Sequence, residues 1–180
     1  MHGTDEGERE SAIIVALARL DGVGCVIIGQ DREAQSPDAA MGPGALREAR
    51  RGMKIAQELN LPLVSFIDTP GAELSAEAEE GAIAGEIARC IAAMSSLTVP
   101  TVSVLLGQGT GGGALALLPA KVTIAAEHSW LSPLPPEGAS AIVHGHIDAA
   151  NEMAGQQRVS AVEMWRGGRK EAPTTEFRIF

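Results

Sequence analysis

The sequence predicts an α/β fold with parallel strand pairing. Apolar segments of strand length alternate with helical segments along most of the chain, and such alternation favours a parallel sheet. Hydrophobic residues make up 45% of the 180 residues but aromatic residues only 3%, so the core has to be built from Ala, Val, Ile and Leu in closely packed layers. A chain of this length is expected to form one domain with a sizeable core.

The first expected element is a helix over residues 9–20, where apolar residues recur at near-helical spacing. Asp21-Gly22 is interpreted as the stop signal of that helix. The apolar stretch 24–29 predicts a short buried strand. Residues 30–44 are polar and rich in Pro, Gly and Asp, so they predict a loop long enough to be functional or mobile.

Residues 45–60 predict a second helix with an apolar side and a basic side. Four basic residues recur at spacings of three and four, which places them on one helix face: Arg47, Arg50, Arg51 and Lys54. Two interpretations of this face remain open. It is either solvated or in contact with another subunit, or it docks a phosphate-bearing ligand such as CoA or an acidic partner.

A strand is expected over residues 61–67, and Asp68-Thr69-Pro70-Gly71 predicts a turn at its end. A long helix over 76–96 follows. Glu77, Glu79 and Glu80 lie near the positive end of its dipole, so we interpret them as electrostatic capping groups.

The stretch Gly107-Gln108-Gly109-Thr110-Gly111-Gly112-Gly113-Ala114 is the most informative part of the sequence. A buried strand over 99–106 leads into it, and a short helix over 112–118 follows. Such a turn has no bulky side chain, and the N–H groups at a helix N-terminus have no internal partner. The stretch is therefore expected to hold negative charge, either on a bound phosphate or on an oxyanion that forms during a reaction.

The glycine spacing also fits the Gly-x-Gly-x-x-Gly fingerprint of dinucleotide-binding folds. Two features argue against that interpretation. The fingerprint normally opens the first βαβ unit, whereas several elements precede it here, and Pro119 cuts the following helix short.

Side-chain chemistry offers no alternative site. The sequence has no Gly-x-Ser-x-Gly elbow, and its histidines show no metal-type spacing. Backbone donors without an evident nucleophile, base or metal suit a reaction in which the enzyme stabilises an enolate or ureido oxyanion. The substrates or a cofactor would then supply the reactive groups.

The last predicted elements are a strand over 122–126, a Pro-rich loop over 133–137 and a short helix that starts at Gly138. The two cysteines, Cys25 and Cys90, are far apart in the sequence, and we expect both to be reduced and buried.

Composition narrows the partners and the location. The formal charge of −9 argues against nucleic acid or an anionic membrane as a partner. No apolar run is long enough to span a membrane, and the acidic N-terminus is not that of a signal peptide. We therefore expect a cytoplasmic protein.

Several further motifs follow one another in a set order: Gly44-Ala45-Leu46-Arg47-Glu48-Ala49, Phe66-Ile67-Asp68-Thr69-Pro70-Gly71-Ala72, Ala78-Glu79-Glu80, Gly107 to Ala116 and Pro136-Glu137-Gly138-Ala139-Ser140-Ala141-Ile142. Together they resemble the α-type carboxyltransferase of acetyl-CoA carboxylase. They equally resemble the C-terminal half of fused acyl-CoA carboxylase carboxyltransferases. The resemblance extends from roughly residue 10 to residue 160, and several motifs in one order make it far more specific than any single motif.

The resemblance implies a crotonase/ClpP-like fold of ββα units stacked in a spiral. It implies transfer of a carboxyl group from carboxybiotin, held on a biotin carboxyl carrier protein, to an acyl-CoA, as in malonyl-CoA formation for fatty acid biosynthesis. The α-type half is generally assigned to the biotin side. By position, the backbone amides of Gly113 and Ala114 would form the oxyanion hole and Gly112 would support their turn. Biotin contacts would come from Asp68, Thr69, Pro70, Gly71, Gly109, Thr110 and Gly111.

The chain departs from the family pattern at its end. We expect one domain over residues 1–180, with a tail at 169–180 that loses the pattern and packs poorly. A β-type half is also missing, so a complete site is expected to need a partner chain in a homo- or hetero-oligomer, with no metal in this chain. Two alternatives stay open: a subunit that decarboxylates malonyl thioesters, and a catalytically inactive structural half.

Overall fold

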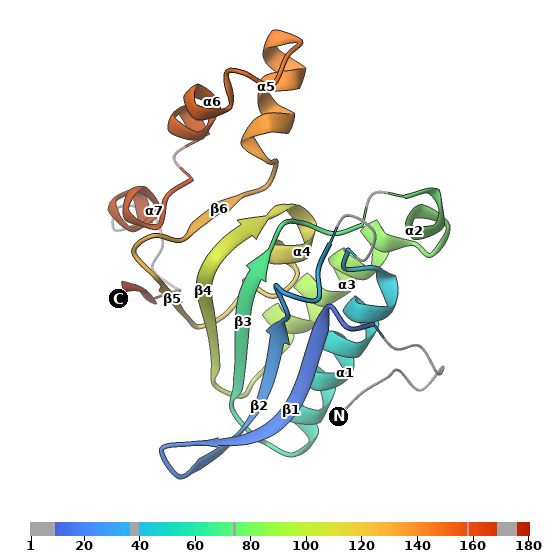
Figure 1. Cartoon of the computed structure of the whole chain (residues 1–180). Coiled ribbons are helices and arrows are strands. Elements are labelled where there is room, and N and C mark those ends of the chain that lie inside the picture. Colours follow the sequence, from blue (N-terminus) through green and yellow to red (C-terminus); the bar gives the residue numbers. More distant parts are fainter. Residues whose placement is uncertain (1–9, 37–39, 74, 158, 169–175) are drawn as a thin grey trace.

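A computed structural model describes residues 10–36, 40–73, 75–157, 159–168 and 176–180 of the chain (Figure 1). Its centre is a sheet with the strand order β1-β2-β3-β4-β5-β7, and β6 pairs with β4 beside this path. All strand pairs in the described part are parallel except β1 with β2. The predicted α/β class with a parallel sheet is therefore confirmed.

The predicted helix over residues 9–20 was wrong. This segment forms β1 (Ile13–Leu20), which pairs antiparallel with β2 (Val23–Gln30). Asp21 and Gly22 both have positive φ, 48° and 81°, as a two-residue hairpin turn requires. The pair is therefore the turn of a β-hairpin and not the stop of a helix.

The parallel strands place the Asp68-Thr69-Pro70-Gly71 turn and the glycine-rich stretch at the same end of the sheet. β3 (Leu63–Thr69) pairs with β4 (Thr101–Thr110), and β4 pairs in turn with β5 (Val122–Ala125) and with β6 (Trp130–Ser132). The carboxyl ends of β3 and β4 therefore lie side by side.

Part of the tail is ordered within the sheet. Residues 169–175 lie outside the described residues, but β7 (Glu176–Ile179) pairs parallel with β5 over four residues. The amide of Phe180 donates to Ala125 O and the amide of Glu127 donates to Phe180 O. The backbone of these residues is thus paired in the sheet, whereas the Phe180 side chain is 64% exposed.

Helices cover one face of the sheet (Figure 1). They are α1 (Pro43–Glu58), α3 (Ile83–Ser96) and α4 (Gly111–Leu115). The short helix α2 (Ala76–Glu80) lies beside the sheet and contacts α3. The single long helix predicted over 76–96 is broken, because Ala82 adopts a left-handed conformation with φ 61° between α2 and α3. Ser75 caps α2 by accepting from the Ala78 amide, and Glu77 and Glu79 lie in its first turn.

Three further helices extend from the end of β6 (Figure 1). They are α5 (Pro136–His144), α6 (Ala150–Gln157) and α7 (Ala161–Gly168). α5 contacts α6, and apolar side chains are exposed at Ile142 and Val143 of α5 and at Ile147 between the two helices. None of the helices in the described part is long and apolar enough to cross a membrane.

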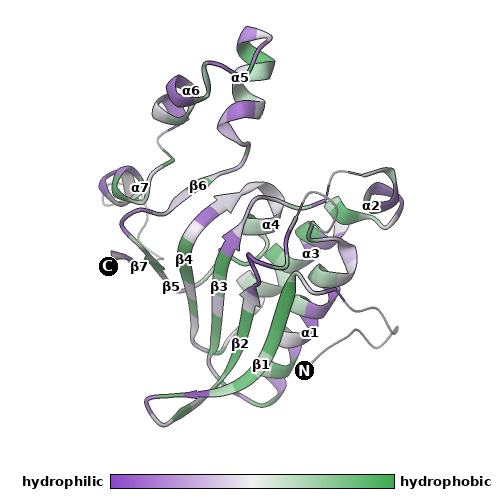
Figure 2. Cartoon of the chain, viewed as in Figure 1, coloured by the Kyte–Doolittle hydropathy of each residue, from purple (hydrophilic) through white to green (hydrophobic). Residues whose placement is uncertain are grey.

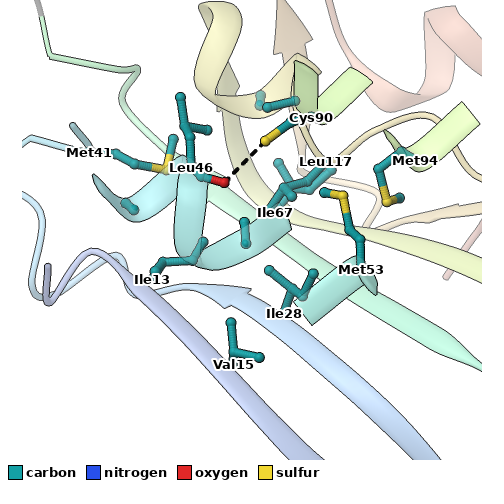
Figure 3. Close-up of a cluster of buried hydrophobic side chains, with 14 of the residues drawn as sticks. Ile13, Val15, Ile28, Met41, Leu46, Met53, Ile67, Cys90, Met94 and Leu117 are labelled. Atoms are coloured by element: carbon teal, nitrogen blue, oxygen red, sulfur yellow. Dashed lines mark hydrogen bonds between the residues drawn. The ribbon is translucent and has the colours of Figure 1, made fainter. Parts of the chain in front are cut away.

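The main core lies between the sheet and the pair α1 and α3. Figure 3 shows Ile13, Ile28 and Ile67 of the sheet facing Leu46 and Met53 of α1. Figure 2 shows that β1 is coloured hydrophobic along most of its length, and one of its apolar side chains, Ile14, is 42% exposed.

Both cysteines are buried, as predicted. The Cys90 thiol donates to Leu46 O over 3.2 Å, which ties α3 to α1. Burial raises the pKa of Cys90 to about 12, although the nearby Arg50 lowers it somewhat and Glu86 raises it further.

Charged side chains make a second link between α1 and α3. Glu86 of α3 is 5% exposed and forms ion pairs with three arginines: Arg50 and Arg47 from α1, and Arg89 from its own helix. A buried carboxylate is stable only when it is paired and hydrogen-bonded, so this cluster fixes how the two helices dock.

We expect Glu86→Gln to lower the free energy of unfolding by about 2 kcal/mol, because two α1 arginines lose a charged acceptor in a largely dry contact. Glu58→Gln is the matched control, since its partner Lys54 is exposed and such a pair contributes about 0.5 kcal/mol or less. Urea unfolding measures both changes, and equal losses in the two variants would contradict the structural role of Glu86.

The Cys90 thiol makes stability depend on pH in the alkaline range. The unfolded thiol ionises near about pH 8.5 but the folded one only near about 12, so above the lower value the unfolded state binds fewer protons. The free energy of unfolding should then fall by up to about 1.4 kcal/mol per pH unit from this group. Cys90→Ser removes the contribution, and urea unfolding between about pH 8 and 10.5 should give converging curves; parallel curves would refute the effect.

Candidate functional site

The glycine-rich stretch divides into a strand end and a helix start. β4 continues to Thr110, so residues 107–110 are strand and the predicted start of the turn at Gly107 was wrong. The chain turns at Gly111, whose φ of 61° suits a residue without a side chain. α4 begins there, one residue earlier than predicted.

The first turn of α4 presents backbone amides at the carboxyl end of β4. Gly113 and Ala114 lie in this turn and are buried. Their N–H groups belong to the first four of the helix, which have no carbonyl partner within it. The arrangement predicted from the sequence, a strand followed by N–H donors at a helix start, is thus present.

Gly113 packs directly on the backbone that follows β3. A Cβ at this position would lie 3.2 Å from Ala72 N, 3.4 Å from Gly71 C and 2.6 Å from the Met41 methyl group. Glycine suits this approach, because a Cβ so close to backbone atoms is uncommon and would require the neighbouring atoms to shift. The sequence prediction did not include Ala72, whose amide nitrogen lines the same contact.

Asp68 joins the ends of β3 and β4. The strands pair in register as far as Ile67 and Leu105, and the register then shifts before Thr69 pairs with Gly109. The Asp68 Oδ1 atom accepts from the Gln108 amide over 3.0 Å within this irregular part. The expectation that the two motifs lie together is met.

The turn after Asp68 is held by Thr69. Its hydroxyl is buried, accepts from the Gly71 amide and donates to Gln35 Oε1. Thr110 is also buried and accepts from the Gln108 side chain. Of the residues predicted around the turn, the structure therefore joins Asp68, Thr69, Gly71, Thr110 and Gly113 in one connected region.

Two buried glutamines at this site were missed by the sequence prediction, which placed both in a loop. Gln30 ends β2, donates from Nε2 to Gly113 O over 2.8 Å and accepts at Oε1 from the Asp68 amide over 3.1 Å. Gln35 donates to Asp68 O over 3.2 Å. The available signal was a polar residue directly after the apolar run 25–29, at the carboxyl end of a strand.

The basic face of α1 has partners inside the protein. Arg47 and Arg50 pair with Glu86 of α3, and Lys54 pairs with Glu58 one turn away. Arg51 also has an interaction of its own. These contacts favour the structural interpretation of this face, and a role in binding CoA or a partner stays a prediction.

Ser129 is buried and donates to Ala126 O, while the neighbouring His128 is exposed. In the described part of the chain no three His, Cys, Asp or Glu residues gather as metal ligands. A cavity of about 450 Å³ near α4 is lined by apolar side chains such as Leu115, Leu118 and Met164, with Thr123 among them. The donors at the turn are thus neutral backbone amides.

Comparison with known proteins gives consistent relatives. The sequence pattern of the family described as "Acetyl co-enzyme A carboxylase carboxyltransferase-like" matches residues 1–168. A probable biotin-dependent acyl-coenzyme A carboxylase beta3 subunit of Mycobacterium tuberculosis is 51% identical over 168 residues, which are 93% of this chain and 34% of that protein. The acetyl-coenzyme A carboxylase carboxyl transferase subunit alpha of Francisella philomiragia is 32% identical, over 89% of this chain and 53% of that subunit.

Solved structures show the same fold. The transcarboxylase 12S hexamer core superimposes with a TM-score of 0.79 at 22% identity, over 98% of this chain and 36% of that chain. A malonate decarboxylase hetero-dimer from Pseudomonas gives 0.75 at 17% identity, over 93% and 71%. The predicted crotonase-like fold is therefore confirmed, and the chain spans about a third of the length of the first relatives that it matches. By the extent of the match and by its fold, the chain belongs to the acetyl-coenzyme A carboxylase carboxyltransferase-like family.

Proposed function

We propose that this chain is the biotin-side component of an acyl-CoA carboxylase carboxyltransferase, with the Gly113 and Ala114 amides as its oxyanion hole. The observation that carries the proposal is the contact of Gly113 with the Gly71-Ala72 backbone. It holds two helix-start amides rigidly at the common end of β3 and β4. Rigid donors of this kind stabilise charge that develops on an oxygen without reorganising.

The donor set fits biotin. The ureido oxygen of biotin is a neutral acceptor that gains negative charge in the reaction, and preorganised backbone N–H donors stabilise such an oxygen. Bound carboxybiotin supplies the carboxyl group that is transferred. In this chain Asp68 to Gly71 and Gly109 to Gly111 would wall its pocket, and Gly112 would support the turn that carries the donors.

The remaining parts of the reaction are assigned to partners. We propose that an acyl-CoA binds on a β-type carboxyltransferase half and that a biotin carboxyl carrier protein delivers the biotin. The product with acetyl-CoA would be malonyl-CoA, the precursor of fatty acids. One relative is named as a carboxyl transferase subunit alpha, another as subunits beta/alpha, and the transcarboxylase core is described as a hexamer. These names support an assembly in which the site is completed by a β-type half.

A second candidate function is the decarboxylation of malonyl thioesters without biotin. The likeness to malonate decarboxylase favours it, because the same amides would serve a thioester oxygen. A third possibility, an inactive structural half, is less well supported, because the complete turn from Gly111 to Ala114 is retained.

We expect the chain, co-purified with a β-type carboxyltransferase half, to transfer the carboxyl group of a carboxylated biotin carrier to acetyl-CoA. Radiolabelled carboxybiotin followed into malonyl-CoA measures this. The matched reaction omits biotin and supplies malonyl thioester. Release of CO2 in that reaction, with no transfer in the first, would replace the proposal by the decarboxylase function.

Gly113→Ala should lower kcat by about 100-fold or more, because its Cβ pushes α4 from Ala72 and misplaces the donors. Gly52→Ala is the control, since its Cβ would lie 3.0–3.1 Å from Val15 and Ile28 in the core and thus strains packing away from the turn. We expect the control to lose thermal stability but to keep its kcat. Comparable kcat losses in both variants would show that general strain, not donor placement, explains the effect.

A further inference from the structure

Gln30 connects the three backbone segments that meet at the glycine turn. It is 7% exposed at the end of β2. Its Nε2 donates to Gly113 O over 2.8 Å and lies 3.7 Å from Met41 Sδ, while its Oε1 accepts from the Asp68 amide over 3.1 Å. One side chain therefore joins β2, the end of β3 and the first turn of α4.

The orientation of the Gln30 amide group is fixed by these partners. The Asp68 N–H is a donor, so it requires the oxygen of the side-chain amide, and the NH₂ group must then face Gly113 O. Reversing the group would set two donors against each other at Asp68 and two acceptors at Gly113. The contact to Gly113 O therefore has a defined direction.

The carbonyl that Gln30 holds belongs to the same peptide unit as the Ala114 N–H. This unit is planar, and in its trans form the C=O and N–H bonds point in opposite directions; no peptide in the described residues is cis. Fixing Gly113 O consequently fixes where the Ala114 N–H points. A donor on the carbonyl also polarises the peptide and strengthens its N–H as a donor.

We propose that Gln30 is a positioning residue that aims and strengthens the Ala114 amide as an oxyanion donor. The inference rests on the proposed function for its catalytic meaning, but its geometric part, the control of the Gly113-Ala114 peptide, can be measured separately. Gln30 itself touches no reacting atom in this scheme and acts through the peptide.

Gln30→Leu tests the proposal, because leucine fills a similar volume without the two hydrogen bonds. With the partner half and the carboxylated carrier, kcat should fall about 10–100-fold, while KM for the carrier changes little. Gln35→Leu is the matched control: Gln35 is 5% exposed and holds the Asp68-Thr69 segment, but no contact to Gly113 is found for it. The control should lose stability, with any kinetic effect in KM. Wild-type kcat in Gln30→Leu would overturn the proposal.

Gln30→Glu adds a test that a purely structural role would not pass. Only the protonated carboxyl group can donate to Gly113 O while accepting from the Asp68 amide. Its kcat relative to wild type should therefore rise as the pH falls, whereas the ratio for Gln30→Leu stays flat. Division by the wild-type rate at each pH removes the pH dependence that both proteins share. A flat ratio for Gln30→Glu would contradict the proposal.

An NMR measurement on the unliganded protein separates this inference from the function. The amide ¹⁵N and ¹H resonances of Ala114 should move much further in Gln30→Leu than in Gln35→Leu, because Gln30 donates to the Gly113 carbonyl directly whereas Gln35 contacts the Asp68-Thr69 segment. Unchanged Ala114 resonances would overturn the positioning role whatever the activity. If the Ala114 resonances move in Gln30→Leu but the wild-type protein transfers no carboxyl group, the proposed function is refuted. The positioning role of Gln30 then still holds.

Discussion

The close contact between Gly113 on α4 and the Gly71-Ala72 backbone is the constraint on which the site depends. It brings two chain segments that leave neighbouring strands to within van der Waals distance. The contact is possible because β3 and β4 are parallel neighbours and run in register up to Ile67 and Leu105. The helices behind the sheet then fix both strands, through the apolar core and through the Glu86 cluster that docks α3 on α1.

Most of the fold could be predicted from local patterns, and its main error shows where such patterns are ambiguous. From residue 24 to residue 125 the order of strands and helices was predicted correctly apart from the break between α2 and α3, because apolar runs and turn residues mark each element. The short strand β6 (Trp130–Ser132) was not predicted. Residues 13–20 were misassigned because Ile13, Leu17 and Leu20 fit a helical spacing. Ile13 and Val15, which are buried in the sheet, fit a strand equally well. The Asp21-Gly22 turn resolves this ambiguity, since two positive φ angles match the twist of a hairpin.

The site could be predicted only as far as it depends on neighbouring parallel strands. Asp68 and the glycine turn follow successive strands, so their proximity follows from parallel pairing alone. Gln30 comes from β2, and its contact with Gly113 bridges 83 residues of sequence. That contact requires β2 to lie beside β3, which no local pattern reports. The same holds for the α1 arginines, whose partner Glu86 lies on another helix.

In a site made of backbone amides, the strength of the donors depends on packing and not on which side chains are present. The proposed donors carry no charge and no side-chain identity, so their strength depends on where the Gly113-Ala114 peptide lies and how it is polarised. A transcarboxylase and a decarboxylase structure share this fold, with TM-scores of 0.79 and 0.75, and on the proposed function such donors serve an oxygen of either substrate class. The choice of reaction would then lie with the partner half. This chain would contribute the part common to both reactions, which is the Ala114 amide. Gln30 sets the direction of this amide, and the absence of a side chain at Gly113 allows α4 to approach the Gly71-Ala72 backbone.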